Sequence, residues 1–230
     1  MNRFRKLVYV ILSSGILAGL FLFAVQHFTI FPLIEKAEVY ESAAEKSDTH
    51  HHIDEGWRPA DGMERTSFTA LTTVVTAIGF SALLFGIVGL VPVALDWRKG
   101  LVWGLAAFVC IDLAPSFGLL PQPPGTAVAD LYARQEWWVF TVLSTAAGLW
   151  LLLNRRRPAT VRLIGVLPLM LPHAIGAPVA QGSSAVPVTL IHQFALLSIL
   201  TTGLFWVVLG AVGGLLYRRS GYVEAQERIR

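Results

Sequence analysis

Six long apolar stretches, separated by shorter polar segments, dominate the sequence. They run over residues 7–31, 68–95, 101–120, 137–153, 161–179 and 191–217. A helix needs about 20 apolar residues to cross the hydrocarbon core of a bilayer, and every stretch is near that length. The pattern therefore predicts an all-α integral membrane protein built as a bundle of about six transmembrane helices.

The fifth stretch is the least regular because it contains Pro168, Pro172 and Pro178. Proline lacks a backbone donor, and a carbonyl freed inside a membrane must find another partner. The segment is either a kinked span or a re-entrant piece. Five spans plus a re-entrant segment is thus the alternative to six full spans.

Clusters of basic residues predict the orientation, because Lys and Arg concentrate on the cytoplasmic side. Such clusters precede the first stretch and follow the second, fourth and sixth: Arg3, Arg5, Lys6; Arg98, Lys99; Arg155, Arg156, Arg157, Arg162; Arg218, Arg219. Six full spans satisfy the rule at every loop and place both termini, including the tail 218–230, in the cytoplasm. Five spans would place that tail outside, so the charge pattern favours six.

The first stretch is expected to remain in the protein as a span. A signal-peptide core has about 7–15 apolar residues and ends at a small-residue cleavage site. Residues 7–31 are longer, and no convincing cleavage site follows them. We therefore expect a multi-pass protein of the bacterial inner membrane, with 1–230 as a single membrane domain in contact with lipid.

Composition agrees with a membrane protein. Charged residues make up 14% of the chain, against about 25% in soluble domains. The formal charge of +3 comes from clumps between the apolar stretches, which does not make a phosphate-binding surface. We therefore expect no nucleic-acid partner.

Motifs of the common enzyme classes are absent from the sequence. It contains no phosphate-binding GxxxxGK[ST], no GxSxG and no HExxH, and its single cysteine, Cys110, excludes a CxxC motif. We expect no enzyme activity and no tightly bound cofactor. A membrane-embedded enzyme acting on lipid or quinone is the alternative with the poorest support.

Small residues predict close contacts between helices, and tryptophans predict positions at the membrane interface. Gly15 with Gly19, and Gly210 with Gly214, have GxxxG spacing, which lets helices approach closely. The adjacent Trp137 and Trp138 open the fourth span, where aromatic residues commonly sit at the membrane interface.

The outward-facing loop 32–67 is acidic and contains His50, His51 and His52. Four of its carboxylates are three or four residues apart and share one face if the first helix continues: Glu35, Glu38, Glu41 and Glu45. One interpretation is a solvated helix face followed by a flexible linker. The other is capture of cations, since imidazole binds transition metals and carboxylates concentrate them locally.

Two ionisable residues lie inside the apolar stretches, where they are costly and commonly functional. At a rise of about 1.5 Å per residue, Asp112 lies roughly 17 Å and His173 roughly 18 Å from the cytoplasmic side. Their similar depth predicts a shared ion site. His27, Glu136 and His192 lie near outer span ends and would line its mouth.

Structural interpretations of the same two residues stay open. Asp112 could satisfy backbone groups freed by Pro115, and His173 could hydrogen-bond a carbonyl freed at the Pro172 kink. Two protein ligands do not complete an octahedral shell. Waters, backbone carbonyls or a partner subunit would have to supply the other ligands.

Several stretches in a fixed order resemble the CbtA family, predicted cobalt transporter subunits of bacterial inner membranes. They are Pro32–Glu41, Trp57–Thr66, Asp112–Pro115, Gly118–Leu119, Pro123–Gly125, Ala133–Trp138, Pro172–His173, Gly176–Pro178 and the region of Phe194. The resemblance implies uptake of cobalt(II) for cobalamin synthesis, with a small single-span, His-rich CbtB-type partner. It assigns no ion ligand.

The expected function is therefore a permease subunit for a divalent transition-metal ion, with cobalt as the expected cargo. Nickel is an alternative cargo, because the ligand preferences of the two ions overlap. A proton-coupled carrier is a variant of this prediction. A non-transporting assembly or regulatory membrane protein, in which the polar residues are structural, is the alternative from another class.

Overall fold

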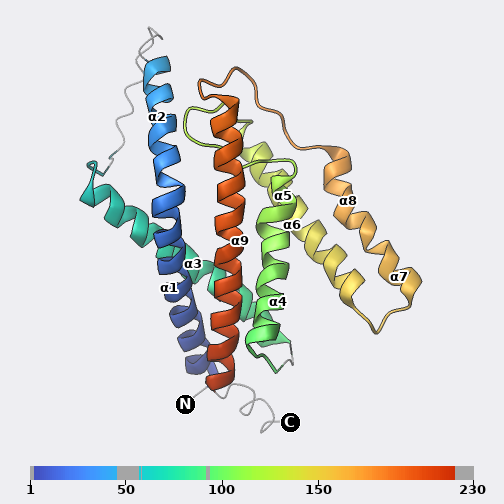
Figure 1. Cartoon of the computed structure of the whole chain (residues 1–230). Helices are drawn as coiled ribbons and strands as arrows, with labels where there is room; N and C mark the ends of the chain where they lie inside the picture. Colours follow the sequence, from blue (N-terminus) through green and yellow to red (C-terminus); the bar gives the residue numbers. More distant parts are fainter. Residues whose placement is uncertain (1–2, 46–56, 58, 92–93, 221–230) are drawn as a thin grey trace. The chain divides into compact units, whose positions relative to one another are not determined.

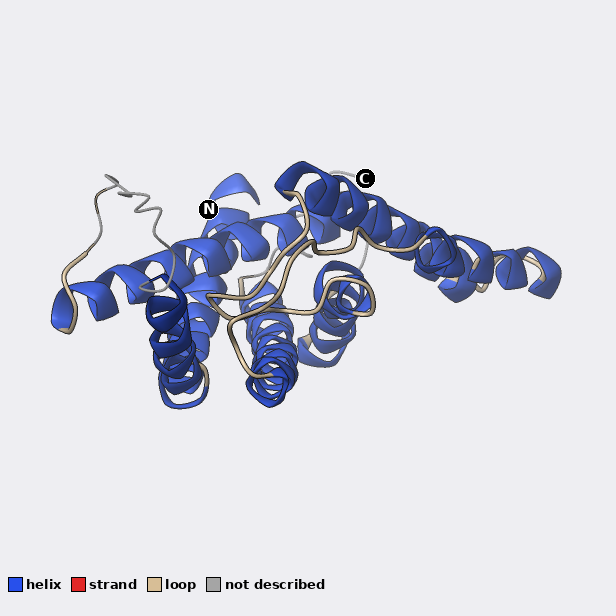
Figure 2. Cartoon of the chain, turned by 90° about the horizontal axis from the view of Figure 1, so that it is seen from above, coloured by secondary structure: helices blue, strands red, loops and turns tan. Residues whose placement is uncertain are grey.

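The computed structural model describes residues 3–45, 57, 59–91 and 94–220, and this part of the chain contains helices and loops but no strand (Figures 1 and 2). The helices are α1 (Arg3–Thr29), α2 (Phe31–Glu45), α3 (Met63–Leu90), α4 (Trp97–Phe108), the π-helix η1 (Val109–Leu113), α5 (Ala114–Ser116), α6 (Leu131–Leu153), α7 (Ala159–Ile164), α8 (Val166–Ile175) and α9 (Val188–Arg219). The predicted all-α membrane class is confirmed.

Among the residues that the structure describes, five helices are long and apolar enough to cross a membrane: Arg3–Thr29, Met63–Leu90, Trp97–Ser116, Leu131–Leu153 and Val188–Arg219. The fifth predicted span instead forms the shorter apolar segment Ala159–Ile175, made of α7 and α8. By helix length the chain fits the alternative of five spans plus one shorter segment. Whether this segment crosses the membrane stays a prediction.

The chain divides into two compact units. Unit 1 comprises Met1–Thr29, His52–Ala107 and Thr201–Arg230, and unit 2 comprises Ile30–His51 and Phe108–Leu200. Unit 1 thus holds α1, α3, nearly all of α4 and most of α9. Unit 2 holds α2, the whole segment from η1 to α8, and the first part of α9.

In unit 1, α1 packs closely on α3 through small residues. A Cβ on Gly15 would lie 2.7 Å from the Cα of Ile78, and one on Gly19 would lie 2.8 Å from the Cα of Val74. The buried hydroxyls of Ser14 and Ser81 are 2.9 Å apart. Since Ser14 donates its one proton to the backbone oxygen of Val10, Ser81 is the donor of this interhelical bond.

The same unit contains a second close helix pair, α4 with α9. A Cβ on Gly104 would lie 3.1 Å from the Cα of Gly210, and one on Gly214 would lie 3.0 Å from the Cα of Gly100. Both GxxxG pairs predicted from spacing therefore face another helix, and α4 contributes a matching pair, Gly100 and Gly104.

The basic ends of three helices lie at one end of unit 1, where α1 and α4 begin and α9 ends (Figure 1). Asp96 begins α4 by accepting hydrogen bonds from the backbone N–H groups of Arg98 and Lys99, both at 2.9 Å. The Lys99 hydrogen bond is the main cause that lowers the pKa of Asp96; burial opposes it, and the bond to Arg98 and the charges of Lys99 and Arg218 add to it.

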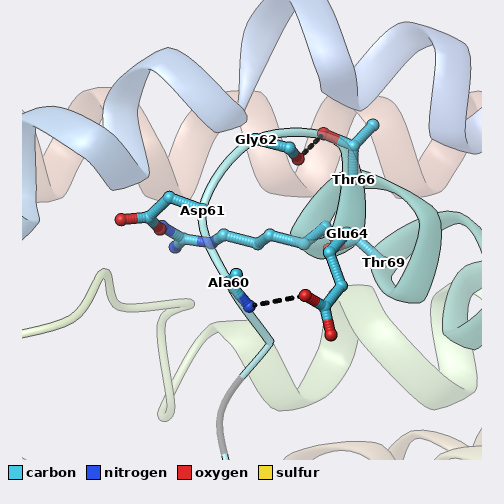
Figure 3. Close-up of polar contacts among 7 residues, drawn as sticks. Ala60, Asp61, Gly62, Glu64, Thr66 and Thr69 are labelled. Carbon is cyan, nitrogen blue, oxygen red and sulfur yellow. Dashed lines mark hydrogen bonds and ion pairs between the residues drawn. The ribbon is translucent and has the colours of Figure 1, made fainter.

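The start of α3 is capped by the loop that precedes it (Figure 3). The Glu64 carboxylate accepts a hydrogen bond from the backbone N–H of Ala60 at 3.2 Å, and Thr66 donates to the backbone oxygen of Gly62. Gly62 has a φ of +91°, a conformation that favours glycine at this turn.

In unit 2, α2 continues the helical course after Ile30 and ends at Glu45. Leu33 and Ala37 are buried against Val186 and Leu190, while Glu35 is exposed. The four carboxylates spaced three or four apart therefore lie on a helix, α2, that is separate from α1. The expected His50–His52 cation capture falls on residues outside the described part and stays a prediction.

Candidate functional site

The third span changes its helical geometry at the position of Asp112. The α-helix ends at Phe108, residues Val109–Leu113 form one turn of π-helix, and α5 follows. Pro115 lacks the N–H that would bond to the backbone oxygen of Ile111. The indole Nε1–H of Trp138 supplies that bond instead, at 3.0 Å. Such π-helical turns occur frequently at functional sites.

Trp137 bonds to the other proline-containing segment of unit 2, at a carbonyl that also accepts from the backbone N–H of Gly176. Its Nε1–H donates to the backbone oxygen of Pro172 at 3.3 Å, and its side chain is buried. Two consecutive tryptophans of α6 thus bond to carbonyls of two different neighbouring segments. Trp137 is buried within the protein, and its expected place at the level of the membrane interface stays a prediction.

A cavity of about 630 Å³ lies beside Asp112 within unit 2. Its polar lining consists of Asp112, Ser116, Gln122, Arg134 and Gln135. The lining also includes Ile111, Pro115, Gly118, Leu119, Leu120, Pro121, Val128, Ala129, Trp138, Ala177, Pro178, Val179 and Ala180. Asp112 is half-buried, and the Ser116 hydroxyl donates to its backbone oxygen at 2.6 Å. This volume is in the range of small-ligand sites, so an ion can enter with part of its water shell.

His173 has a different environment from the one predicted for it. It is half-buried on α8, and its ring makes edge contacts with Phe117 and Trp137, with centroids 6.1 and 5.9 Å apart. It is not among the described residues that line the cavity beside Asp112. The structure therefore places the two residues in the same unit but gives them different neighbours.

The three predicted mouth residues are exposed. Glu136 lines a shallower depression of about 440 Å³ that shares Ala177 and Pro178 with the first cavity. His192 lies on the first turns of α9 in unit 2. His27 belongs to unit 1, where its ring contacts Phe23 and Phe28.

No group of three or more His, Cys, Asp and Glu side chains in the described ranges could hold a metal ion. The described side chains therefore do not form a complete metal-binding shell of these residue types. Oxygen atoms of a kind that binds divalent cations lie on Asp112, on the amides of Gln122 and Gln135, and on backbone carbonyls. Carboxylate, carbonyl and water oxygens hold divalent cations less tightly than an imidazole or thiolate set holds a transition metal.

Residues 4–218 match the family model described as probable cobalt transporter subunit (CbtA). The chain belongs to the CbtA family. No curated protein and no solved structure matches it. The match covers nearly the whole chain, and together with five apolar helices it makes the protein a multi-pass membrane protein of a transporter-subunit family.

Four of the nine stretches that carry the CbtA resemblance contribute to the lining of the cavity. Its lining takes residues from Asp112–Pro115, Gly118–Leu119, Ala133–Trp138 and Gly176–Pro178, which are dispersed in the sequence. Sequence reasoning on this CbtA chain selected Asp112 but missed Arg134, Gln122 and Gln135 as its neighbours. The one available signal was Arg134, a charged residue at the start of an apolar span.

Proposed function

We propose that this chain is the permease subunit for uptake of a divalent transition-metal ion, with cobalt(II) as the cargo. The observation that carries the proposal is Asp112 beside a cavity inside an apolar helix of a CbtA-family chain. A carboxylate at such a position is costly unless it serves an ion path or a pairing. The cobalt would supply cobalamin synthesis.

The proposed path has three stages. The acidic loop, with Glu35 exposed on α2 and His50–His52 beyond it, attracts a partly hydrated cation. Exposed mouth residues, His192, Glu136 and His27, exchange some of its water. Asp112 then holds the ion weakly, together with waters and amide oxygens, before release inward. Weak binding is required because an ion that binds too tightly does not leave.

His173 remains the second proposed residue of this path. Its ring contacts with Phe117 and Trp137 support a role in holding the wall on which Pro172 and the stretch Ala177–Pro178 lie. In that role it shapes the cavity without ligating the ion.

The proposed setting is the bacterial inner membrane, with both termini in the cytoplasm and a small single-span, His-rich CbtB-type subunit as partner. The basic ends of α1, α4 and α9 at one end of unit 1 support this orientation, since basic residues concentrate on the cytoplasmic side (Figure 1). The subunit designation of the family supports a partner.

The test is uptake of radiolabelled cobalt by cells that lack other cobalt importers. The chain is expressed alone, with the neighbouring small subunit, and as Asp112→Asn. Asp96→Asn is the matched control, because Asp96 belongs to unit 1, does not line the cavity, and asparagine is also a good helix N-cap. We expect uptake that depends on the chain and is lost in Asp112→Asn but kept in Asp96→Asn.

Two results would contradict the proposal. Normal cobalt uptake by Asp112→Asn would remove this residue from the path. No uptake under any condition, with the protein correctly inserted, would favour a non-transporting assembly or regulatory role. Competition by excess nickel in the same assay measures the choice between the two cargoes.

A further inference from the structure

The cavity beside Asp112 holds one charge of each sign among its described lining residues. Asp112, on η1, is the carboxylate, and Arg134, in the first turns of α6, is the cation. Both side chains are half-buried. A guanidinium stays protonated at any physiological pH, so Arg134 contributes a permanent positive charge to a cavity assigned above to a cation.

This charge balance has a consequence for any ion that enters. With the ion absent, Arg134 and Asp112 together leave the lining neutral, which limits the cost of a carboxylate in an apolar helix. A divalent ion bound to Asp112 would meet a like charge in the same cavity. That repulsion weakens binding unless the guanidinium moves away.

The structure provides another place for the guanidinium. Asp130 is the N-cap of α6, exposed to solvent, and its carboxylate accepts a hydrogen bond from the backbone N–H of Ala133 at 3.0 Å. Arg134 follows Asp130 by four residues, and its backbone N–H donates to the Asp130 backbone oxygen at 3.0 Å. Side chains four apart at a helix start are neighbours, so the Asp130 carboxylate lies within reach of the Arg134 side chain.

We propose that Arg134 is a tethered competing cation that exchanges between Asp112 and Asp130. It occupies the Asp112 side of the cavity when no ion is present, and it moves toward Asp130 when a divalent cation binds. Its return helps to expel the ion on the inward side. A monovalent cation competes poorly with a guanidinium for one carboxylate, so Arg134 also sets the preference for divalent ions. The inference rests on the proposed function, because it assumes that Asp112 receives the cargo.

The test compares Arg134→Gln with the parent chain, using cobalt chloride as the probe and the purified full chain in nanodiscs. Titration calorimetry measures affinity, with and without 150 mM potassium as the competing monovalent ion. Arg156→Gln is the matched control, because Arg156 is an exposed arginine of unit 2 that does not line the cavity. Arg134→Lys keeps the charge.

We expect Arg134→Gln to bind cobalt about tenfold more tightly, the effect of removing one close like charge. Potassium should now compete measurably, and cobalt uptake by cells should fall although binding is stronger. Arg134→Lys and Arg156→Gln should bind like the parent. Asp130→Asn keeps the helix cap but removes the second carboxylate, so it should weaken cobalt binding several-fold.

The outcomes separate this inference from the proposed function. If Asp112→Asn abolishes binding but Arg134→Gln binds no more tightly than the parent, Arg134 is a structural residue and only the exchange is overturned. If Asp112→Asn leaves binding unchanged, both the ion path and the exchange are overturned. Should Arg134→Gln fail to fold, unchanged affinity in Asp130→Asn would by itself count against the exchange.

Discussion

The indole N–H of Trp138 donates a hydrogen bond to the backbone oxygen of Ile111, 3.0 Å away on the neighbouring helix. In a regular helix this oxygen would accept from residue 115, but Pro115 has no N–H. Inside a membrane no water replaces the missing donor, so the bond from α6 makes the proline tolerable. The same bond holds the π-helical turn that carries Asp112 against α6.

Replacing Trp138 by phenylalanine should therefore destabilise the third span. The variant keeps an aromatic ring but leaves the Ile111 oxygen without this donor. Hydrogen bonds between membrane helices contribute about 0.6 kcal/mol on average, and an unsatisfied buried acceptor costs about 1–3 kcal/mol, so we expect a loss of roughly 1 kcal/mol. Unfolding of the purified protein in mixed detergent micelles measures it.

Trp150→Phe is the control for this experiment. Trp150 lies on the same helix and is 60% exposed. Its replacement should leave the unfolding midpoint nearly unchanged. Equal destabilisation by the two substitutions would show that the ring of Trp138, rather than its N–H, supports the structure.

Gly15→Ala should destabilise unit 1 by forcing α1 away from α3. The added Cβ would lie 2.7 Å from the Cα of Ile78, a backbone atom that cannot move without shifting the helix. Overpacking of this kind typically costs about 1–3 kcal/mol. Gly79→Ala on α3 is the control, since a Cβ there meets nothing within 4 Å. Thermal melting of the two variants measures the difference in stability. Similar melting temperatures would contradict the close contact between α1 and α3 at Gly15.

Much of the fold follows from hydrophobic length and spacing. The apolar stretches gave five membrane-length helices close to their predicted bounds, and the two GxxxG pairs each face another helix. Whether the fifth stretch forms a full span was harder to predict. Its length suggests a span, but Pro168 and Pro172 fall within it. The structure divides it at Gly165 into α7 and α8, and periodicity does not signal such a division.

The residues of the candidate site could be predicted only in part from the sequence. The sequence singles out Asp112 because a carboxylate within an apolar run is rare. Its neighbours Gln122, Arg134 and Gln135 come from other segments, and polar residues near span ends are ordinary in a membrane protein. Equal estimated depth suggested that His173 faces Asp112. Depth says nothing about rotation around the helix axis. The ring of His173 contacts Phe117 and Trp137, and a site shared with Asp112 stays a prediction.

Acidification should weaken the start of α4 through Asp96. Hydrogen bonds from the backbone of Lys99 and Arg98 and the nearby basic charges lower its pKa below the ordinary value of an aspartate. A lowered folded-state pKa means that the ionised carboxylate stabilises the folded state above that value, and that this contribution is lost as the pH falls through the lower folded pKa. We expect the melting temperature of the parent to fall further than that of Asp96→Asn between pH 6 and pH 3. Parallel curves for the two proteins would contradict this role.

His173→Phe should keep most of the cobalt uptake. The ring of His173 contacts the rings of Phe117 and Trp137, so an aromatic replacement of similar volume preserves the wall, and we expect uptake within about twofold of the parent. His173→Ala should lower both uptake and thermal stability, because the two aromatic rings lose their shared neighbour.

The opposite pattern would identify His173 as an ion ligand. In that case His173→Phe would abolish uptake at a normal protein level and melting temperature, and His173→Gln, whose amide oxygen can bind a divalent cation, would recover part of it. The comparison separates the two roles because phenylalanine provides the aromatic ring without a metal-binding atom, whereas glutamine provides such an atom without the ring.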